Sequence, residues 1–288
     1  MTIPRAVVRD LHTGPDAARL MALIMLVFSV SPILAPLFGS LVTQFGSWRE
    51  IFWAVALIGL LALAVAHFLL RETRPQAERI PFDVPTITRS YLDLFRDKHY
   101  LGVVFIGGFG LASFFAFLAS SSFVYMNHFG LTPTQYSFAF SVNAIAFIGM
   151  SQLAGTFGKR FGLQRTVNAA LTFYLCSTTL LLALTLAGVV NLWVLIAMLF
   201  ISFASMGLVI PSTAVLALDN YGRTAGTAAA LMGTLQLVTG AVVVGIVGAF
   251  STGEVLPMVL PIAVCALIAF VLGRLTLGRA EAVPQPAE

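Results

Sequence analysis

Long runs of apolar residues alternate with short polar segments along almost the whole chain. Runs long enough to cross a membrane occur at about 20–42, 51–70, 100–124, 136–157, 167–190, 192–218, 225–250 and 255–277. A membrane-spanning helix needs about 20 apolar residues, and the alternating segments of about 10 residues that build membrane barrels are absent from this sequence. The pattern predicts an all-α polytopic membrane protein with eight transmembrane helices.

The composition agrees with lipid as the surroundings of the chain. Of the 288 residues, 59% are apolar and 10% are charged, whereas about 25% are charged in soluble domains. The two cysteines, Cys176 and Cys265, lie inside apolar runs without metal-ligand spacing, so we expect neither a disulfide scaffold nor a metal centre. The net charge of +4 does not indicate nucleic-acid binding, because the basic residues are dispersed over short loops.

Lysine and arginine are confined almost entirely to every second loop. Of the 16 such residues, only Arg49 falls on the other side; the rest lie in 1–19, 71–99, 158–166, 219–224 and the C-terminal stretch. Positively charged loops stay in the cytoplasm, so both termini and the 71–99 segment are predicted to be cytoplasmic. We expect a multi-pass protein of the cytoplasmic (inner) membrane.

The 71–99 segment divides the chain unequally. It carries three prolines and six basic residues; two predicted spans precede it and six follow it. One large class of transporters joins two six-span halves through a long basic cytoplasmic loop. We therefore expect residues 1–70 to be a remnant of an N-terminal bundle, 71–99 to be a cytoplasmic linker, and 100–288 to form a six-helix bundle.

Residue patterns for enzyme chemistry are missing from the predicted spans. No H-E-x-x-H, no G-x-S-x-G and no pair of aspartates occurs within them. We expect no catalytic residue, no metal and no cofactor, and we do not expect an enzyme. Carboxylates at bilayer depth usually mark ion paths, yet Glu50, Asp219 and Glu254 all lie at the edges of spans.

Neutral polar and aromatic side chains at bilayer depth are the remaining candidates for a binding site. Asn143 and Gln236 lie inside predicted spans, Tyr125 lies at the end of the third span, and Phe114 belongs to a Phe-rich stretch of that span. Amides at this depth serve either as interhelical hydrogen-bonding groups or as the lining of a cavity. For the phenylalanines, an aromatic wall for apolar ligands competes with plain packing. These four residues form the candidate substrate cavity.

Small residues recur at every fourth position in the first predicted span. Ser31, Ala35 and Gly39 form this stripe, and Pro32 and Pro36 lie between them. Such a stripe lets a second helix approach closely, and Pro36 removes a backbone donor and bends the helix. A generic tight contact and the hinge of a gate both explain the pattern.

The N-terminal stretches resemble one transporter family. The small-residue stripe, with Ser40, is similar to the antiporter motif in the fifth helix of the major facilitator superfamily. Residues 5–10 resemble the end of the fourth helix of that family, and residues 48–53 resemble the outer turn into its sixth helix.

The C-terminal stretches resemble the bicyclomycin-resistance (Bcr/CflA) multidrug-efflux subfamily. Residues 128–135, followed by Asn143, are similar to its seventh-to-eighth connection and eighth helix, and residues 225–236 are similar to its eleventh helix. Between the eighth and ninth helices, the superfamily loop G-x-L-x-D-R-x-G-R-[RK] is retained at four positions, Gly155, Arg160, Gly162 and Arg165. Lys159 stands at the acidic position, so the latch between that carboxylate and a helix dipole is not carried over.

The resemblance implies that the eight spans correspond to helices 5–12 of a twelve-helix major facilitator fold, in a chain that lacks the first four helices and the acidic proton-binding position of the first. It implies proton-coupled efflux of small amphipathic drugs, with the proton gradient as the energy source and no cofactor. The alternatives are a sugar or organic-acid carrier of the same fold and a non-transporting membrane remnant. Drugs and the lipid bilayer are the expected partners, and no nucleic acid or obligate protein partner is expected.

Overall fold

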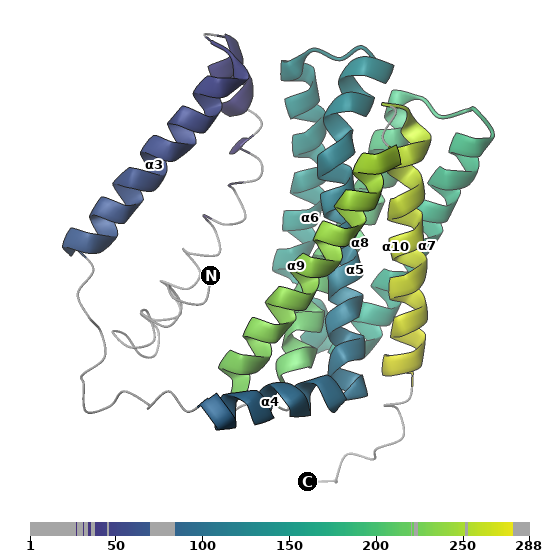
Figure 1. Ribbon diagram of the computed structural model, residues 1–288. Coiled ribbons are helices and arrows are strands. Elements are labelled where there is room, and N and C mark those ends of the chain that lie inside the picture. The colour runs from purple at the N-terminus through teal and green to yellow at the C-terminus, as the bar shows by residue number, and fades with distance from the viewer. Residues whose placement is uncertain are drawn as a thin grey trace. The chain divides into compact units, whose positions relative to one another are not determined.

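The computed structural model describes residues 27, 31, 34–35, 38–44, 46–69, 84–219, 221, 224–250 and 253–278. Every regular element in these ranges is helical, which confirms the all-α prediction (Figure 1). The chain divides into two compact units, 1–83 and 84–288.

Seven of the described helices are long and apolar enough to cross a membrane. In the first unit this helix is α3 (Trp48–Leu69). In the second unit they are α5 (Lys98–Phe123, continued by the π-helical turn η2, Val124–His128), α6 (Pro133–Phe161), α7 (Leu163–Leu186), α8 (Leu192–Leu218), α9 (Ala225–Phe250) and α10 (Val255–Leu277). They correspond to seven of the eight predicted spans, and the first predicted span, 20–42, lies mostly outside the described residues.

Capping residues decide where the helices begin and end. α8 coincides with its apolar run because Asn191 caps it, with the side chain accepting a hydrogen bond from the Val194 amide at 2.9 Å. α6 extends beyond the predicted 136–157 because Thr132 and Gln135 form a capping box before it. At its other end Gly162, with φ of 86°, is the single residue between α6 and α7.

The segment predicted as a linker contains a helix that is not among the predicted spans. α4 (Val84–Arg96) crosses the end of the bundle where α5 and α9 begin, which we call the α4 end (Figure 1). Its Leu94 is 1% exposed, whereas Asp93 and Arg96 are exposed. Such a helix is amphipathic, and its mean hydropathy is therefore too low to be recognised as a span.

Asp97 joins the start of α5 to the loop between α8 and α9. Its carboxylate accepts hydrogen bonds from the amides of His99 (2.8 Å) and Tyr100 (3.0 Å), which caps α5, and from the hydroxyl of Tyr221. Burial by itself raises the pKa of Asp97, but these hydrogen bonds bring it below the usual value of 3.8. Tyr100 in turn donates to the Ala228 carbonyl of α9 at 2.6 Å. These contacts fasten α5 to α9 at the α4 end.

α5 and α8 form the centre of the bundle. α5 packs along α8, α9 and α10, and α8 packs along α5, α6 and α7. Glycine permits the closest approach: a Cβ on Gly207 of α8 would clash with the Phe147 carbonyl of α6 and lie 3.0 Å from the Ser151 nitrogen. Because lipid tails are as apolar as the side chains, close contact of this kind holds membrane helices together.

Replacing Gly207 with alanine should push α8 away from α6 and destabilise the bundle by about 1–3 kcal/mol, the usual cost of overpacking. The added Cβ faces backbone atoms of α6, which cannot rotate aside as a side chain can. The midpoint of thermal unfolding in detergent measures the loss. Gly233→Ala on α9 is the matched control, because no described atom lies within 4 Å of its added Cβ. Equal midpoints for the two variants would show that α6 and α8 do not touch at Gly207.

Replacing Asp97 with alanine should destabilise the protein by about 0.5–2 kcal/mol, the cost of losing an N-cap. The loss is pH-dependent, because the native pKa of Asp97 lies below 3.8. The contribution of the carboxylate is present at neutral pH and disappears as the pH falls through that native pKa. Thermal midpoints of wild type and variant should therefore differ at pH 7 and converge in acid. Asp93→Ala, at an exposed position of α4, should leave the thermal midpoint unchanged at both pH values. If the midpoints of wild type and Asp97→Ala differ by the same amount at every pH, the capping role of the Asp97 carboxylate is contradicted.

Candidate functional site

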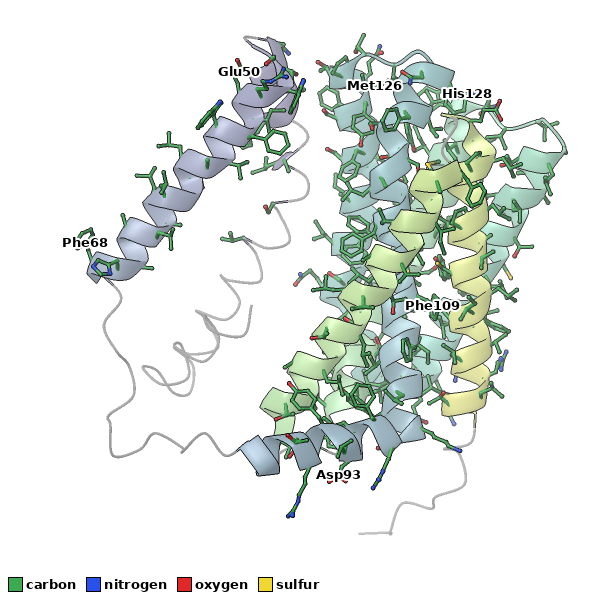
Figure 2. The ribbon with its side chains drawn as sticks, in the orientation of Figure 1. Glu50, Phe68, Asp93, Phe109, Met126 and His128 are labelled. Carbon is green, nitrogen blue, oxygen red and sulfur yellow. The ribbon has the colours of Figure 1, made fainter. Side chains whose placement is uncertain are left out.

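A π-helical turn ends α5 and holds Tyr125 inside the bundle. In this turn the Phe129 amide donates to the Val124 carbonyl, five residues back, at 3.2 Å, and Tyr125 is 0% exposed. Gly130, with φ of 69°, then redirects the chain towards α6. Met126 and His128 mark this end of the bundle, opposite Asp93, in Figure 2, and we call it the π-turn end. π-helical turns occur frequently at functional sites.

Tyr125 and Asn143 meet inside the bundle without completing a hydrogen bond. Asn143 of α6 is 2% exposed, and its Oδ1 and Nδ2, like the Tyr125 hydroxyl, have no hydrogen-bond partner among the described residues. Both residues lie beside Phe117, whose ring is edge-on to Tyr125 and stacks on Phe140, one turn before Asn143. A buried polar group left unpaired costs about 1–3 kcal/mol. The pair therefore lowers stability, and packing does not explain it.

Aromatic rings from three helices surround this pair. Phe117 of α5 lies edge-on to Tyr125 with ring centroids 6.4 Å apart, and it stacks on Phe140 of α6 at 5.7 Å. Phe203 of α8 contacts Phe117 at 4.9 Å and Phe114 at 5.9 Å. We call Phe114, Phe117, Phe140 and Phe203 the aromatic cluster. Phe140 and Phe203 were not recognised in the sequence, where nothing distinguishes them from the other 22 of the 24 phenylalanines.

Gln236 lies at a different depth from Asn143. A Cβ on Gly107 of α5 would come within 2.8 Å of both Gln236 Nε2 and the Thr213 hydroxyl of α8, so Gln236 lies beside Gly107. Asn143 lies in α6 three residues after Phe140, which stacks on Phe117. Phe117 is ten residues beyond Gly107 on α5, and the three residues from Phe140 to Asn143 on antiparallel α6 run back toward Gly107, so the two levels are roughly 10 Å apart by the helical rise. The structure brings Phe114, Tyr125 and Asn143 together, and it places Gln236 elsewhere, half-buried between α5, α8 and α9.

The small-residue stripe lies in the first unit. Ser31, Ala35 and Gly39 are helical, whereas Pro32 and Pro36 lie outside the described residues. A Cβ on Gly39 would meet no described atom within 4 Å. The role of the stripe in a gate stays a prediction.

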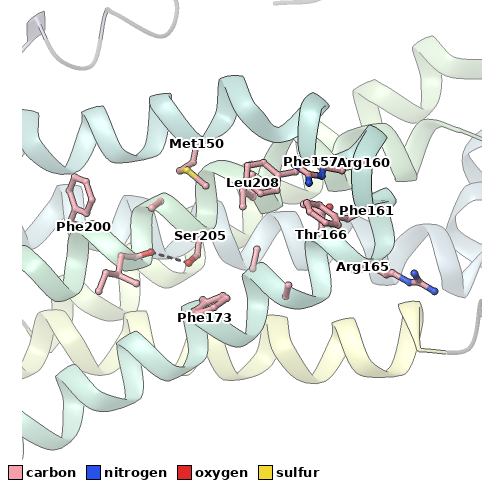
Figure 3. Close-up of a pocket in the computed structure, with 14 residues that line it drawn as sticks. Met150, Phe157, Arg160, Phe161, Arg165, Thr166, Phe173, Phe200, Ser205 and Leu208 are labelled. Carbon is pink, nitrogen blue, oxygen red and sulfur yellow. Dashed lines mark hydrogen bonds between the residues drawn. The ribbon is translucent and has the colours of Figure 1, made fainter.

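The residues of the loop motif lie at the α4 end. Gly162 has the positive φ that favours glycine, and Arg160 and Arg165 flank it in the last turn of α6 and the first turn of α7. Both arginines line an apolar groove between α6, α7 and α8 (Figure 3). Gly155, earlier in α6, has open space around its Cα among the described residues.

Metal chemistry has no support in the described part of the chain. No group of three or more histidine, cysteine or carboxylate side chains there is placed to hold an ion. Charged residues of the described spans lie near the helix ends.

Comparison with known proteins identifies the family. A family model described as Major Facilitator Superfamily matches residues 1–244. The chain is 32% identical over 257 residues to "Uncharacterized MFS-type transporter YdgK" of Bacillus subtilis, a match that covers 88% of this chain and 64% of that protein. It is 31% identical over 265 residues to "Bicyclomycin resistance protein homolog" of Haemophilus influenzae, with 91% of this chain and 66% of that protein covered.

A third relative also has a name that refers to drugs. The chain is 25% identical over 274 residues to "Multidrug resistance protein MdtL" of a Shewanella species, strain ANA-3, with 93% of this chain and 66% of that protein covered. The chain thus spans between 64% and 66% of the length of these relatives. The match to the family model, the relatives and the membrane-spanning helices together show that this multi-pass membrane protein belongs to the Major Facilitator Superfamily, a family of transporters and not of enzymes.

Proposed function

We propose that this protein exports small amphipathic drugs across the cytoplasmic membrane in exchange for protons. The observation that carries the proposal is the buried pair of Tyr125 and Asn143, whose polar atoms no described residue engages, beside the aromatic cluster. Ligand sites in proteins combine an apolar wall with a few polar groups that fix orientation. The names of two relatives, which refer to bicyclomycin and to multidrug resistance, support drugs as the substrate.

The chemistry of the pair fits a neutral ligand or one with a weakly polar head. The phenol and the carboxamide each donate and accept hydrogen bonds, and neither carries a charge. An organic acid needs a cation at the site, but the described spans hold their basic residues near the helix ends. A sugar needs many polar partners, whereas the rings beside Tyr125 are those of Phe117 and of Tyr136, whose hydroxyl already bonds to Ser121.

Substrate reaches the pair only when helices move, since Tyr125 is 0% exposed and Asn143 is 2% exposed. We place this movement at the π turn, where the regular hydrogen bonding of α5 is interrupted next to Tyr125. Rocking of two bundles about a central site is the general mechanism of such transporters. The stripe of Ser31, Ala35 and Gly39 belongs to the gate in this proposal, and Gln236 lines the cavity deeper in the bundle.

Export driven by protons is tested in cells that lack their own drug pumps. Cells that express this protein should accumulate less bicyclomycin than cells with an empty vector, and a protonophore should abolish the difference. No difference from the empty vector would refute drug export. A difference that survives the protonophore would refute proton coupling.

The role of the pair is tested in the same assay by two conservative substitutions with opposite expectations. Tyr125→Phe removes an unpaired hydroxyl, so stability should stay equal or rise while export falls about five- to tenfold, the value of one hydrogen bond of about 1 kcal/mol or slightly more. Tyr136→Phe removes a hydroxyl that bonds to Ser121 at 2.9 Å, so stability should fall by about 1 kcal/mol while export per folded molecule is kept. Normal export by Tyr125→Phe would return Tyr125 to a packing role.

The orientation is tested by cysteine labelling at the two ends of the bundle. We propose that the α4 end and both chain termini face the cytoplasm, because the basic loops lie there. Cysteine placed at His128, which is exposed at the π-turn end, should react with an impermeant maleimide in intact cells. Cysteine at Asp93, exposed at the α4 end (Figure 2), should react only after permeabilisation. Cys176 and Cys265 are replaced first, and the reverse labelling pattern would invert the topology.

A further inference from the structure

The groove between α6, α7 and α8 has two chemically different parts. It has a volume of about 650 Å³, within the range of small-molecule sites. At the α4 end Arg160 and Arg165 line its mouth, and from there it runs along the helices past Phe157, Phe173 and Phe200 (Figure 3). The distance from Arg160 to Met150 along α6 is roughly 15 Å by the helical rise.

The inner part of the groove offers a ligand only apolar contact. Its two hydroxyls are already engaged: Ser205 donates to the Ile201 carbonyl at 2.9 Å (Figure 3), and Thr166 donates to the Gly162 carbonyl at 2.9 Å. Phe173 is 66% exposed and Phe200 is 41% exposed in the groove. A water molecule gains little here, whereas a hydrocarbon chain fits.

The mouth of the groove lies in a short segment rich in basic residues. Residues 155–166 contain Lys159, Arg160 and Arg165 and no Asp or Glu. The side chains of all three are exposed, and the Arg160 guanidinium lies 5.3 Å from the Phe161 ring centre, at the edge of the apolar surface. The guanidinium fork of an arginine matches the oxygens of a phosphate, and the apolar stem of the side chain packs on apolar surface.

We propose that this groove is a binding site for an anionic phospholipid, with an acyl chain along α6, α7 and α8 and the headgroup phosphate at Arg160 and Arg165. Charge and polarity select this occupant: the site requires an apolar tail about as long as the groove and a negative head at the level where the helices leave the membrane. Basic pockets between membrane helices bind anionic headgroups for this reason. The proposed orientation places this lipid in the cytoplasmic leaflet, and the binding site itself does not depend on that orientation.

Photocrosslinking of the full chain in nanodiscs tests the proposal. Benzoylphenylalanine at Phe173 should capture phosphatidylglycerol at least fivefold more than phosphatidylcholine from a mixture of equal parts. The matched control position is Leu260, in a second groove formed by α5, α9 and α10, whose lining residues are all apolar. Capture at Leu260 should show no preference between the two lipids.

The arginines are tested by Arg160→Gln and Arg165→Gln in the crosslinking protein. Each should reduce the preference for phosphatidylglycerol at Phe173 about fivefold, as expected for one basic residue near an anionic headgroup. Millimolar glycerol phosphate should not compete, because it lacks the acyl chain. Equal capture of both lipids at Phe173, or a preference that both variants retain, would refute the site. Loss of capture with glycerol phosphate would show that the mouth binds a soluble anion instead.

Discussion

Close approach of helix backbones is the interaction on which the second unit depends. In lipid there is no hydrophobic driving force between helices, because lipid tails are as apolar as the side chains. Helices therefore associate through van der Waals contact and hydrogen bonds. Gly207 of α8 provides that contact with the backbone of α6, and Gly107 of α5 leaves room for the side chains of Thr213 and Gln236 from α8 and α9. A Cβ at either position would meet α8, α9 or α6 at less than contact distance. The positions of the remaining helices follow from these approaches.

Hydrogen bonds between helices are completed where they hold the bundle together. Ser177 of α7 pairs with Ser202 of α8 at 2.9 Å, and Tyr100 of α5 donates to the Ala228 carbonyl of α9 at 2.6 Å. Tyr125 and Asn143 are equally buried and remain without such bonds. The hydroxyls of Ser120 and Ser212 are also buried without a partner, but Tyr125 and Asn143 leave three such atoms open beside the aromatic cluster. Local losses of stability of this kind are typical of functional sites. This contrast is the physical basis for assigning substrate to the pair.

The sequence predicts the helices better than it predicts the site. Hydropathy alone located α8 to the residue because Asn191 and Asp219 lie at the ends of its apolar run. It missed α4, whose single apolar face does not raise the mean hydropathy, and it shortened α6, whose Thr132 cap and basic last turn are polar. The meeting of Tyr125 with Asn143 could not be read from the sequence, because hydropathy does not show which faces of α5 and α6 pack together. The same limit applies to Gln236, for which an amide inside a span did not reveal its depth relative to Asn143.

The single-residue link at Gly162 makes the two ends of the bundle mechanically unequal. With no slack between them, α6 and α7 cannot slide along each other at the α4 end, and the Thr166 and Gly162 contacts lock that elbow further. At the π-turn end, α5 and α6 are joined by an irregular turn and the residues up to Thr132. A change in the angle between α5 and α6 therefore meets less covalent restraint than a change between α6 and α7, so α6 and α7 keep the geometry of the groove that they share.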